Sequence, residues 1–392
     1  MGSIHARLAG VMKPLDPNWI AEVRKRLREW FQRAHRPLPW RATRDPYHIW
    51  VSEIMLQQTQ TATVVPYYER FIQRFPTVQA LAEAPLEEVL RYWEGLGYYA
   101  RARNLHRAAQ IVAQQGGELP REVERLRELP GIGAYTAGAI ASLAFNQPEP
   151  VVDGNVTRVL ARLLWLKGNL KALRAQRTLY ELARQLVDPE EPGVFNQALM
   201  ELGSTVCTPT QPRCTECPLQ SLCAAYQRGE PTAVPEPIPA RPSVQVVDVS
   251  ALIWREGQLL LAQRPPSGLW GGLWEFPRAT RNGCETLETV ALRAAQKVGI
   301  YAEPVRLLGH VRHVVTYHSI RLYGYLCLFE GGAARSEEYV ALRWVTPDAI
   351  DAYPLSAPQR RLARMLDSLT LLETVAQLPT QQMRQKEEVA SE

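Results

Sequence analysis

The chain lacks any run of eighteen apolar residues, so no stretch of it is long enough to cross a bilayer as a helix. Residues 1–13 lack the continuous apolar segment of a secretory signal peptide. We therefore expect a cytoplasmic protein without a membrane partner. The 392 residues exceed one ordinary core and predict at least two domains. A net charge of +5 permits a nucleic acid partner without requiring one.

Cysteine is scarce, and four of the six cysteines lie in one short stretch. They are Cys207, Cys214, Cys217 and Cys223. Two disulfides are one alternative, but nothing else indicates an oxidising compartment. Structural zinc sites usually show two close pairs of ligands, and here only Cys214 and Cys217 form such a pair. An uneven run of four thiols favours an iron–sulfur cluster over zinc, with these cysteines as its ligands.

The spacing of apolar residues changes once along the chain, from a helical period to a period of two. Apolar residues recur at helical spacing across a mainly α domain that we expect to span 16–230 and to include the cysteine stretch 207–223. Five prolines then predict a stiff linker over 231–243. Period-two patterns follow, with one helix among them, and predict an α+β domain over 244–370. The last residues, 371–392, are polar and predict a disordered tail.

A glycine hairpin lies between two helical patterns. Gly131 and Gly133 are separated by one apolar residue, and the next helix begins at once. Glycine accepts positive φ at little cost, which suits a tight hairpin. The free N–H groups of a helix start form an anion site that a DNA phosphate fits. The flanking Leu-Pro and Tyr-Thr-Ala-Gly favour a helix-hairpin-helix DNA-binding motif over a plain helix–helix turn.

An aspartate follows the hairpin. Taken alone, Asp153 is most simply the N-cap of the helical run after it. The hairpin, this aspartate and the four cysteines together resemble the endonuclease III superfamily of DNA glycosylases over residues 16–226. The resemblance implies a [4Fe-4S] cluster on the four cysteines.

The absence of a catalytic lysine indicates which branch of this superfamily the chain resembles. Superfamily members that also cleave the strand carry a lysine nucleophile where this chain has Tyr135, and a phenol cannot form a Schiff base. Segments 38–41 (LPWR) and 46–60 (PYHIWVSEIMLQQTQ) resemble the monofunctional adenine DNA glycosylase (MutY) family. Glu53 stands at that family's catalytic glutamate. Its helical neighbours Ile49, Trp50 and Leu56 are apolar, which predicts desolvation and a raised pKa suited to a general acid.

The family resemblance implies a reaction and its residues. Glu53 is expected to protonate an adenine flipped out of duplex DNA, Asp153 to stabilise the sugar cation, and Tyr135 to orient a carboxyl. The substrate implied is adenine opposite 8-oxoguanine, and we expect a monomer. Tyr98 and Gln58 are implied to enter the duplex. Arg101 lies in an arginine-rich, aromatic segment that we expect to contact phosphates.

The C-terminal domain resembles a Nudix domain from residues 259–277 onward. Every metal-binding carboxylate of a working Nudix hydrolase is missing from residues 292–298 (LRAAQKV), so we expect lesion recognition and no nucleotide hydrolysis. The family reads 8-oxoguanine through a Phe-Ser/Thr-His loop, and the matching residues here are Val315, Thr316 and Tyr317. The hydroxyl is kept at Thr316, and His318 follows directly.

Three alternatives stay open from the sequence. The first is a lyase-type glycosylase for oxidised pyrimidines, against which Tyr135 and the second domain argue. The second is a non-catalytic mismatch-binding protein, against which Glu53 and Asp153 argue. The third and weakest is a nucleotide pyrophosphatase, because the carboxylates it needs are missing.

Overall fold

The computed structural model describes residues 14–239 and 241–366, and its contacts divide the chain into two units. The first comprises residues 1–84 and 101–240, and the second comprises residues 85–100 and 241–392. The tail expected over 371–392 lies outside the described residues. No helix of the described residues is long and apolar enough to cross a membrane.

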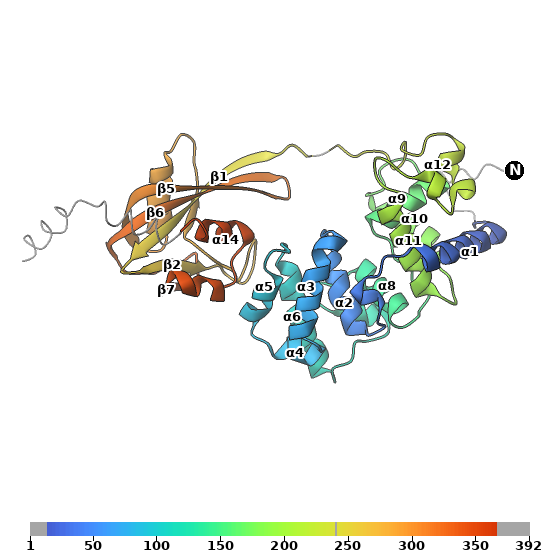
Figure 1. The fold of residues 1–392 in the computed structure, drawn as a ribbon, viewed down its shortest axis with the longest axis horizontal. Coiled ribbons are helices and arrows are strands. Elements are labelled where there is room, and N and C mark those ends of the chain that lie inside the picture. Colours follow the sequence, from blue (N-terminus) through green and yellow to red (C-terminus); the bar gives the residue numbers. More distant parts are fainter. Residues whose placement is uncertain (1–13, 240, 367–392) are drawn as a thin grey trace, which may run out of the picture. The chain divides into compact units, whose positions relative to one another are not determined.

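The first unit is helical (Figure 1). Its elements are α1 (Pro17–Ala34), η1 (Pro39–Arg41), α2 (Pro46–Leu56), α3 (Thr61–Arg74), α4 (Val78–Glu83), α6 (Ala100–Gln114), α7 (Val123–Glu128), α8 (Ala134–Leu143), α9 (Gly154–Leu164), α10 (Leu173–Leu186), α11 (Pro192–Thr205), η2 (Cys214–Glu216), η3 (Gln220–Leu222) and α12 (Ala224–Gln227).

Local sequence signals set the start of α2, the helix that carries Glu53. Asp45 caps it by accepting hydrogen bonds from the N–H groups of Tyr47 and His48, and Pro46 occupies the first turn. Apolar side chains surround the helix, and every residue from Ile49 to Met55 is buried. A helix that is apolar all round lies in a core. The one carboxyl on this stretch is therefore carried into the protein interior.

A hydrophobic core joins the helices behind the cysteine stretch. It is formed by side chains from α1, α9, α10 and α11, with Leu27, Leu160, Leu179 and Leu202 among its members. Three of the clustered cysteines pack against it: Cys207, Cys217 and Cys223. The short cysteine stretch has no core of its own and is held against this one.

The second unit is built on a mixed sheet. Its elements are α5 (Leu86–Trp93), β1 (Val244–Arg255), β2 (Gln258–Gln263), β3 (Trp274–Glu275), β4 (Arg278–Thr280), α13 (Leu287–Gln296), β5 (Ile300–Val315), β6 (His318–Gly332), β7 (Ala341–Val345), η4 (Pro347–Ala352) and α14 (Ala357–Ala363). The sheet runs in the order β3-β2-β1-β6-β5, with β4 paired to β1 and β7 paired to β2. Strands β1 and β6 are parallel, whereas β5 and β6 form an antiparallel hairpin.

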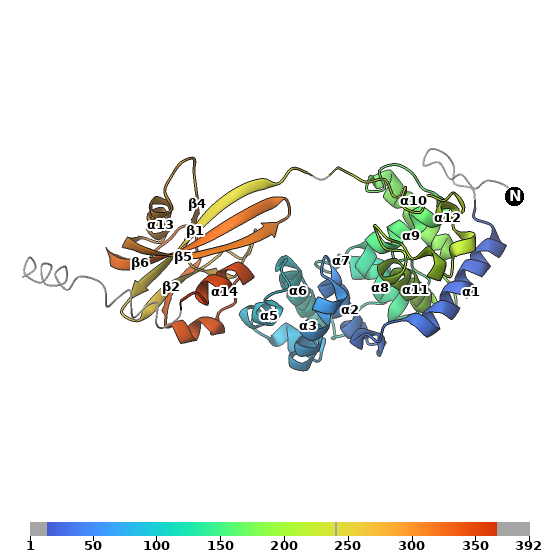
Figure 2. The same ribbon diagram turned by 45° about the horizontal axis from the view of Figure 1, so that its top comes forward.

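Alternating residues of β1 contribute to two cores, one on each face of this sheet. Figure 2 shows helices α13 and α14, which cover these faces. Val249, Ala251 and Ile253 pack with α13 on one face. Leu252 packs on the other face with Leu362 of α14. Side chains alternate across a strand, so one strand supports both layers. The α+β architecture expected for this part of the chain is confirmed.

The structure adds two details to the expected division into a helical domain over 16–230 and a stiff linker over 231–243. Residues 85–100 lie between α4 and α6 in the chain, yet by their contacts they belong with the second unit. Within the expected linker, the Val234 side chain is fully buried and its carbonyl accepts a hydrogen bond from Arg162 Nε at 3.1 Å. Val234 is therefore packed on the helical unit.

Candidate active site

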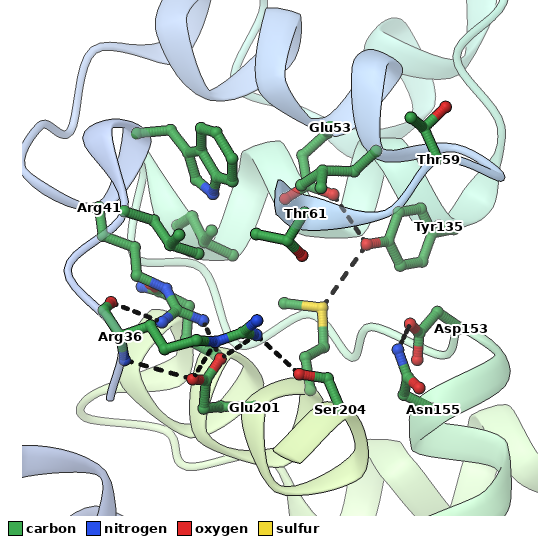
Figure 3. Close-up of a pocket in the computed structure, with 16 residues that line it drawn as sticks. Arg36, Arg41, Glu53, Thr59, Thr61, Tyr135, Asp153, Asn155, Glu201 and Ser204 are labelled. Carbon is green, nitrogen blue, oxygen red and sulfur yellow. Dashed lines mark hydrogen bonds and ion pairs between the residues drawn. The ribbon is translucent and has the colours of Figure 1, made fainter. Parts of the chain in front are cut away.

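A cavity of about 150 Å³ in the helical unit brings the expected acidic residues together (Figure 3). Glu53, Tyr135 and Asp153 all line it, although they come from α2, α8 and the N-cap of α9. A cavity of about this volume is known to hold a benzene ring in another protein, so one aromatic ring is the right scale of occupant. The cavity is open to solvent along part of its wall.

Glu53 is 3% exposed, and burial raises the pKa of its carboxyl to about 7. The hydrogen bond from Tyr135 opposes this rise in pKa, and the nearby Asp153 carboxylate adds to it. The burial and raised pKa that the apolar neighbours predicted are thus confirmed. A carboxyl that is half protonated near neutral pH is suited to proton transfer in both directions.

Tyr135 connects two walls of the cavity. Its hydroxyl lies 2.7 Å from Glu53 Oε2 and 3.5 Å from Met200 Sδ. Burial first, then the neighbouring Glu53 and Asp153 carboxyls, raise the pKa of Tyr135 well above its usual value. The phenol is therefore a fixed hydrogen-bond donor to Glu53.

Asp153 performs the capping that its position predicts. Its Oδ1 accepts the Val156 N–H at 2.7 Å, and its Oδ2 accepts from Asn155 Nδ2 at 3.0 Å. Burial raises the pKa of Asp153, while these hydrogen bonds and the Arg158 guanidinium oppose the rise. Arg158 Nη2 also donates to Asn155 Oδ1 at 2.8 Å, and its Nε donates to the Cys207 carbonyl at 2.8 Å. The aspartate is thus tied to the cysteine stretch.

Besides Glu53 and Asp153, the cavity wall carries a third carboxyl group, which is buried and which the sequence did not indicate. Glu201 of α11 accepts hydrogen bonds from Arg36 Nε at 2.7 Å and from Arg41 Nη2 at 2.8 Å (Figure 3). Burial alone would raise the pKa of Glu201, but the two arginines lower it to about 2. The available signal was a lone charged residue between Met200 and Leu202 in an apolar helix.

The glycine hairpin joins α7 to α8, and only one of its glycines uses positive φ. Gly131 has a φ of +82°, and a Cβ there would lie 2.8 Å from Asn104 Cβ. Gly133 is the N-cap of α8 with an ordinary φ of −90°. No side chain caps α8 there, as an anion site at the helix start would require.

The guanidinium of Arg101, which the sequence predicts to contact phosphates, is directed at the end of α2. Its Nη1 donates to the carbonyls of Ile54 and Met55, at 3.0 and 2.9 Å, and also to the Gln57 carbonyl. Arg101 thereby satisfies the carbonyls at the end of α2. Gln58 is exposed, has a φ of +58°, and lines a groove that also contains Asp153.

The remaining residues expected at DNA lie in the second unit. Tyr98 is 49% exposed. Thr316 and Tyr317 form the two-residue turn between β5 and β6, and Thr316 has a φ of +55°. The Thr316 hydroxyl donates to the Val315 carbonyl at 2.7 Å, and the His318 ring lies against Tyr317 with centroids 4.2 Å apart.

The cysteine stretch offers the ligand chemistry of a metal cluster. Burial raises the pKa of the Cys217 thiol to about 12, with repulsion from the other three cysteines contributing. Cys207 and Cys223 both contact Arg162. Arg162 is buried, and its Nη1 donates a hydrogen bond to Cys207 Sγ at 3.3 Å. Within the described residues, no three His, Cys, Asp or Glu side chains are already arranged around a metal position.

Comparisons with known proteins match both units. The family model of the HhH-GPD superfamily base excision DNA repair proteins matches residues 51–185, and the NUDIX domain model matches residues 249–365. The adenine DNA glycosylase of Rattus norvegicus is 38% identical over 404 residues, covering 89% of this chain and 78% of that protein. The adenine DNA glycosylase of Homo sapiens is 38% identical, with 88% and 74% covered.

A solved structure supports the helical fold. The structure of a thermostable thymine-DNA glycosylase matches with a TM-score of 0.50 and 30% identity, covering 54% of this chain and 98% of that chain. The mainly helical glycosylase fold and the Nudix-like fold expected from the sequence are both confirmed.

Proposed function

This chain belongs to the adenine DNA glycosylase family of base-excision repair enzymes, and we propose that the adenine it removes is the one mispaired with 8-oxoguanine in duplex DNA. The observation that carries adenine removal is the meeting of Glu53 and Asp153 at one cavity of the size of an aromatic ring. A glycosidic bond is out of reach within the base stack, so the nucleotide is flipped into this cavity.

The reaction is then divided between two carboxyls. Glu53 donates a proton to N7 of adenine, and the N-glycosidic bond breaks with its electron pair leaving on the base. The deoxyribose is left as a cation, which the Asp153 carboxylate stabilises or captures. Glu53, now ionised, accepts a proton from the water that attacks the sugar. Tyr135 holds Glu53 in place through the 2.7 Å hydrogen bond.

Base selection is assigned to the missed carboxylate. Glu201 stays ionised between Arg36 and Arg41 and offers only hydrogen-bond acceptors. Adenine presents an exocyclic amine donor beside N7, where guanine presents a carbonyl oxygen, and thymine presents a carbonyl oxygen in place of an amine. An acceptor fixed on the cavity wall therefore favours adenine.

Cys207, Cys214, Cys217 and Cys223 are the residues that would hold a [4Fe-4S] cluster, with zinc as the alternative. The group would supply structural restraint to a stretch that has no core of its own. Arg162 would donate to the Cys207 thiolate from its buried position. The arginine-rich stretch and the glycine hairpin would contact DNA backbone.

The second unit is proposed to read the opposing base. Thr316, Tyr317 and His318 would contact 8-oxoguanine from the β5–β6 turn, while Gln58 and Tyr98 would enter the duplex. Residues 292–298 on and after α13 carry no carboxylate, which supports a recognition role for this Nudix-like domain. A monomer in the cytoplasm stays our prediction.

The test is a panel of duplexes with adenine opposite 8-oxoguanine, guanine, cytosine and thymine, scored by released adenine under single-turnover conditions. We expect release to be fastest opposite 8-oxoguanine and slower opposite guanine. A borohydride-trapped covalent adduct would instead indicate a lyase-type enzyme. Tight mismatch binding with no released base would indicate a non-catalytic protein.

A further inference from the structure

One residue of the C-terminal sheet domain holds both ends of a turn that is remote from it in sequence. The Leu355 N–H donates to Glu94 Oε2 at 3.4 Å, and the Leu355 carbonyl accepts from the Tyr99 hydroxyl at 3.2 Å. Leu355 is fully buried. The turn between Glu94 and Tyr99 is thus fixed at its first and last residues, and Tyr98 lies between them.

A bidentate ion pair reinforces the first of these two attachments. Arg360 Nε lies 2.7 Å from Glu94 Oε1, and Arg360 Nη2 lies 2.9 Å from Glu94 Oε2. The two side chains are only 9% and 17% exposed. Arg360 is itself fixed by the carbonyls of Ile350 and Tyr353, at 3.0 and 2.7 Å. A planar guanidinium held in this way sets the position and the orientation of the carboxylate.

Helix α5 leading into the turn is held at its other end as well. Glu87 Oε1 accepts hydrogen bonds from Trp274 Nε1 at 3.1 Å and from Gln263 Nε2 at 3.0 Å. Both views of the fold place α5 beside α14 and the nearby strands (Figures 1 and 2). The attachment therefore extends along the whole segment and does not depend on a single contact.

The turn needs such support because its backbone is unfavourable. Gly95 and Gly97 have φ of +105° and +71°, and Tyr98 has a φ of +48°. A left-handed conformation is unfavourable for a bulky residue and persists where the surrounding structure determines it. The Tyr98 side chain is nonetheless 49% exposed, so its ring is presented to solvent from a fixed backbone.

We propose that Glu94 and Arg360 are positioning residues for the DNA contact of Tyr98. The inference rests on the proposed function, in which Tyr98 enters the duplex. The C-terminal domain then has a second task besides reading the opposing base, because it fixes the turn that presents Tyr98. That task applies to adenine opposite any base, whereas reading by Thr316 changes with the opposing base.

The experiment measures single-turnover adenine release by the full chain carrying Glu94→Gln. Because small misplacements of a positioned group cost up to about a hundredfold in rate, we expect a fall of about tenfold or more, equal for adenine opposite 8-oxoguanine and opposite guanine. In a Tyr98→Ala background the same substitution should cause no further loss. Asp351→Asn is the matched control, since Asp351 also pairs with Arg360 at 2.8 Å but is 91% exposed. It should leave the rate unchanged.

Each other outcome overturns the inference. Losses that add to those of Tyr98→Ala, or an equal loss from Asp351→Asn, would show that the pair merely stabilises the domain. A normal rate for Glu94→Gln, with an active wild-type chain and an impaired Tyr98→Ala, would remove this inference and leave the proposed function intact. An inactive wild-type chain would instead remove the proposed function.

If the Glu94→Gln variant does not fold, the same rate measurements on a Tyr99→Phe variant test the proposal. It removes the hydrogen bond to the Leu355 carbonyl without leaving an unpaired buried charge. We expect a several-fold loss that is absent in the Tyr98→Ala background. If Tyr99→Phe lowered the rate by the same factor in the wild-type chain and in the Tyr98→Ala chain, the proposal would be contradicted.

Discussion

The hydroxyl of Tyr135 donates a 2.7 Å hydrogen bond to Oε2 of Glu53 inside the cavity, between the hairpin helix and the core helix α2. This contact connects two segments that are 82 residues apart in the sequence. It stabilises the ionised form of Glu53 and so limits a rise in pKa that burial causes. The pKa of Glu53 therefore stays close to neutral pH, where the carboxyl can both donate and accept a proton.

The first prediction concerns Glu53→Gln. An amide of the same shape cannot donate a proton, so we expect adenine release to fall by about 10²–10⁴-fold. In the wild-type chain, release should decline as the pH rises through about 7, because the acid must be protonated. Single-turnover rates measured over about two pH units on either side of this pKa test both points. Near-normal release by the variant would refute the acid role.

The second prediction concerns Tyr135→Phe. Removing the hydroxyl removes a hydrogen bond that lowers the pKa of Glu53, so the pKa should rise further. We expect the alkaline decline of the rate to move upward by about one pH unit, since such a hydrogen bond is worth about 1.4 kcal/mol. The pH profile of the variant is the measurement. A change in rate without a shift of the profile would contradict this role.

The third prediction concerns the stability supplied by Glu201. Its pKa is about 2 in the folded chain and 4.5 ordinarily, so its contribution is present above about pH 4.5 and lost as the pH falls through 2. A difference of this size corresponds to about 3 kcal/mol at neutral pH. Glu201→Gln should therefore lower the free energy of unfolding by about that amount at pH 7. Denaturant unfolding tests it, with the half-exposed Glu191→Gln as control.

The fourth prediction concerns the clustered cysteines. Cys217→Ser should abolish bound iron and sulfide and strongly destabilise the helical unit, because the cysteine stretch packs on its core. The exposed Cys284 is the matched control, and Cys284→Ser should change neither. Iron, sulfide and zinc assays with visible absorbance make the measurement. A result of one bound zinc and no sulfide would contradict the iron–sulfur assignment and show that the site holds zinc.

The fifth prediction concerns the β5–β6 turn. Thr316→Val keeps the branched shape but removes the hydroxyl, so we expect the preference for 8-oxoguanine over guanine to fall about fivefold, the value of one hydrogen bond. Thr316→Ser keeps the hydroxyl and should retain the preference. The ratio of kcat/KM for the two duplexes is the measurement. An unchanged ratio for Thr316→Val would assign the reading to other residues.

The fold could be predicted wherever the local pattern was regular. Strand β5, from Ile300 to Val315, is less regular. Register shifts at Tyr301, Pro304 and Leu307 interrupt the alternation that would indicate a strand of this length from the sequence. The sequence also did not predict that α5 belongs with the C-terminal unit, because the local pattern of a helix does not indicate which part of the protein it packs against.

The sequence by itself determined the chemistry that is available: a carboxyl among apolar neighbours, a tyrosine in place of lysine, an aspartate at a helix start and four close thiols. These are properties of residue types and of short-range spacing, which local sequence expresses directly. The tertiary structure decided which groups meet. It placed Glu201 between Arg36 and Arg41, turned Arg101 inward to the end of α2, and attached both ends of the Tyr98 turn to Leu355. Such contacts join residues far apart in the chain, and only packing of the folded core brings them within hydrogen-bonding distance.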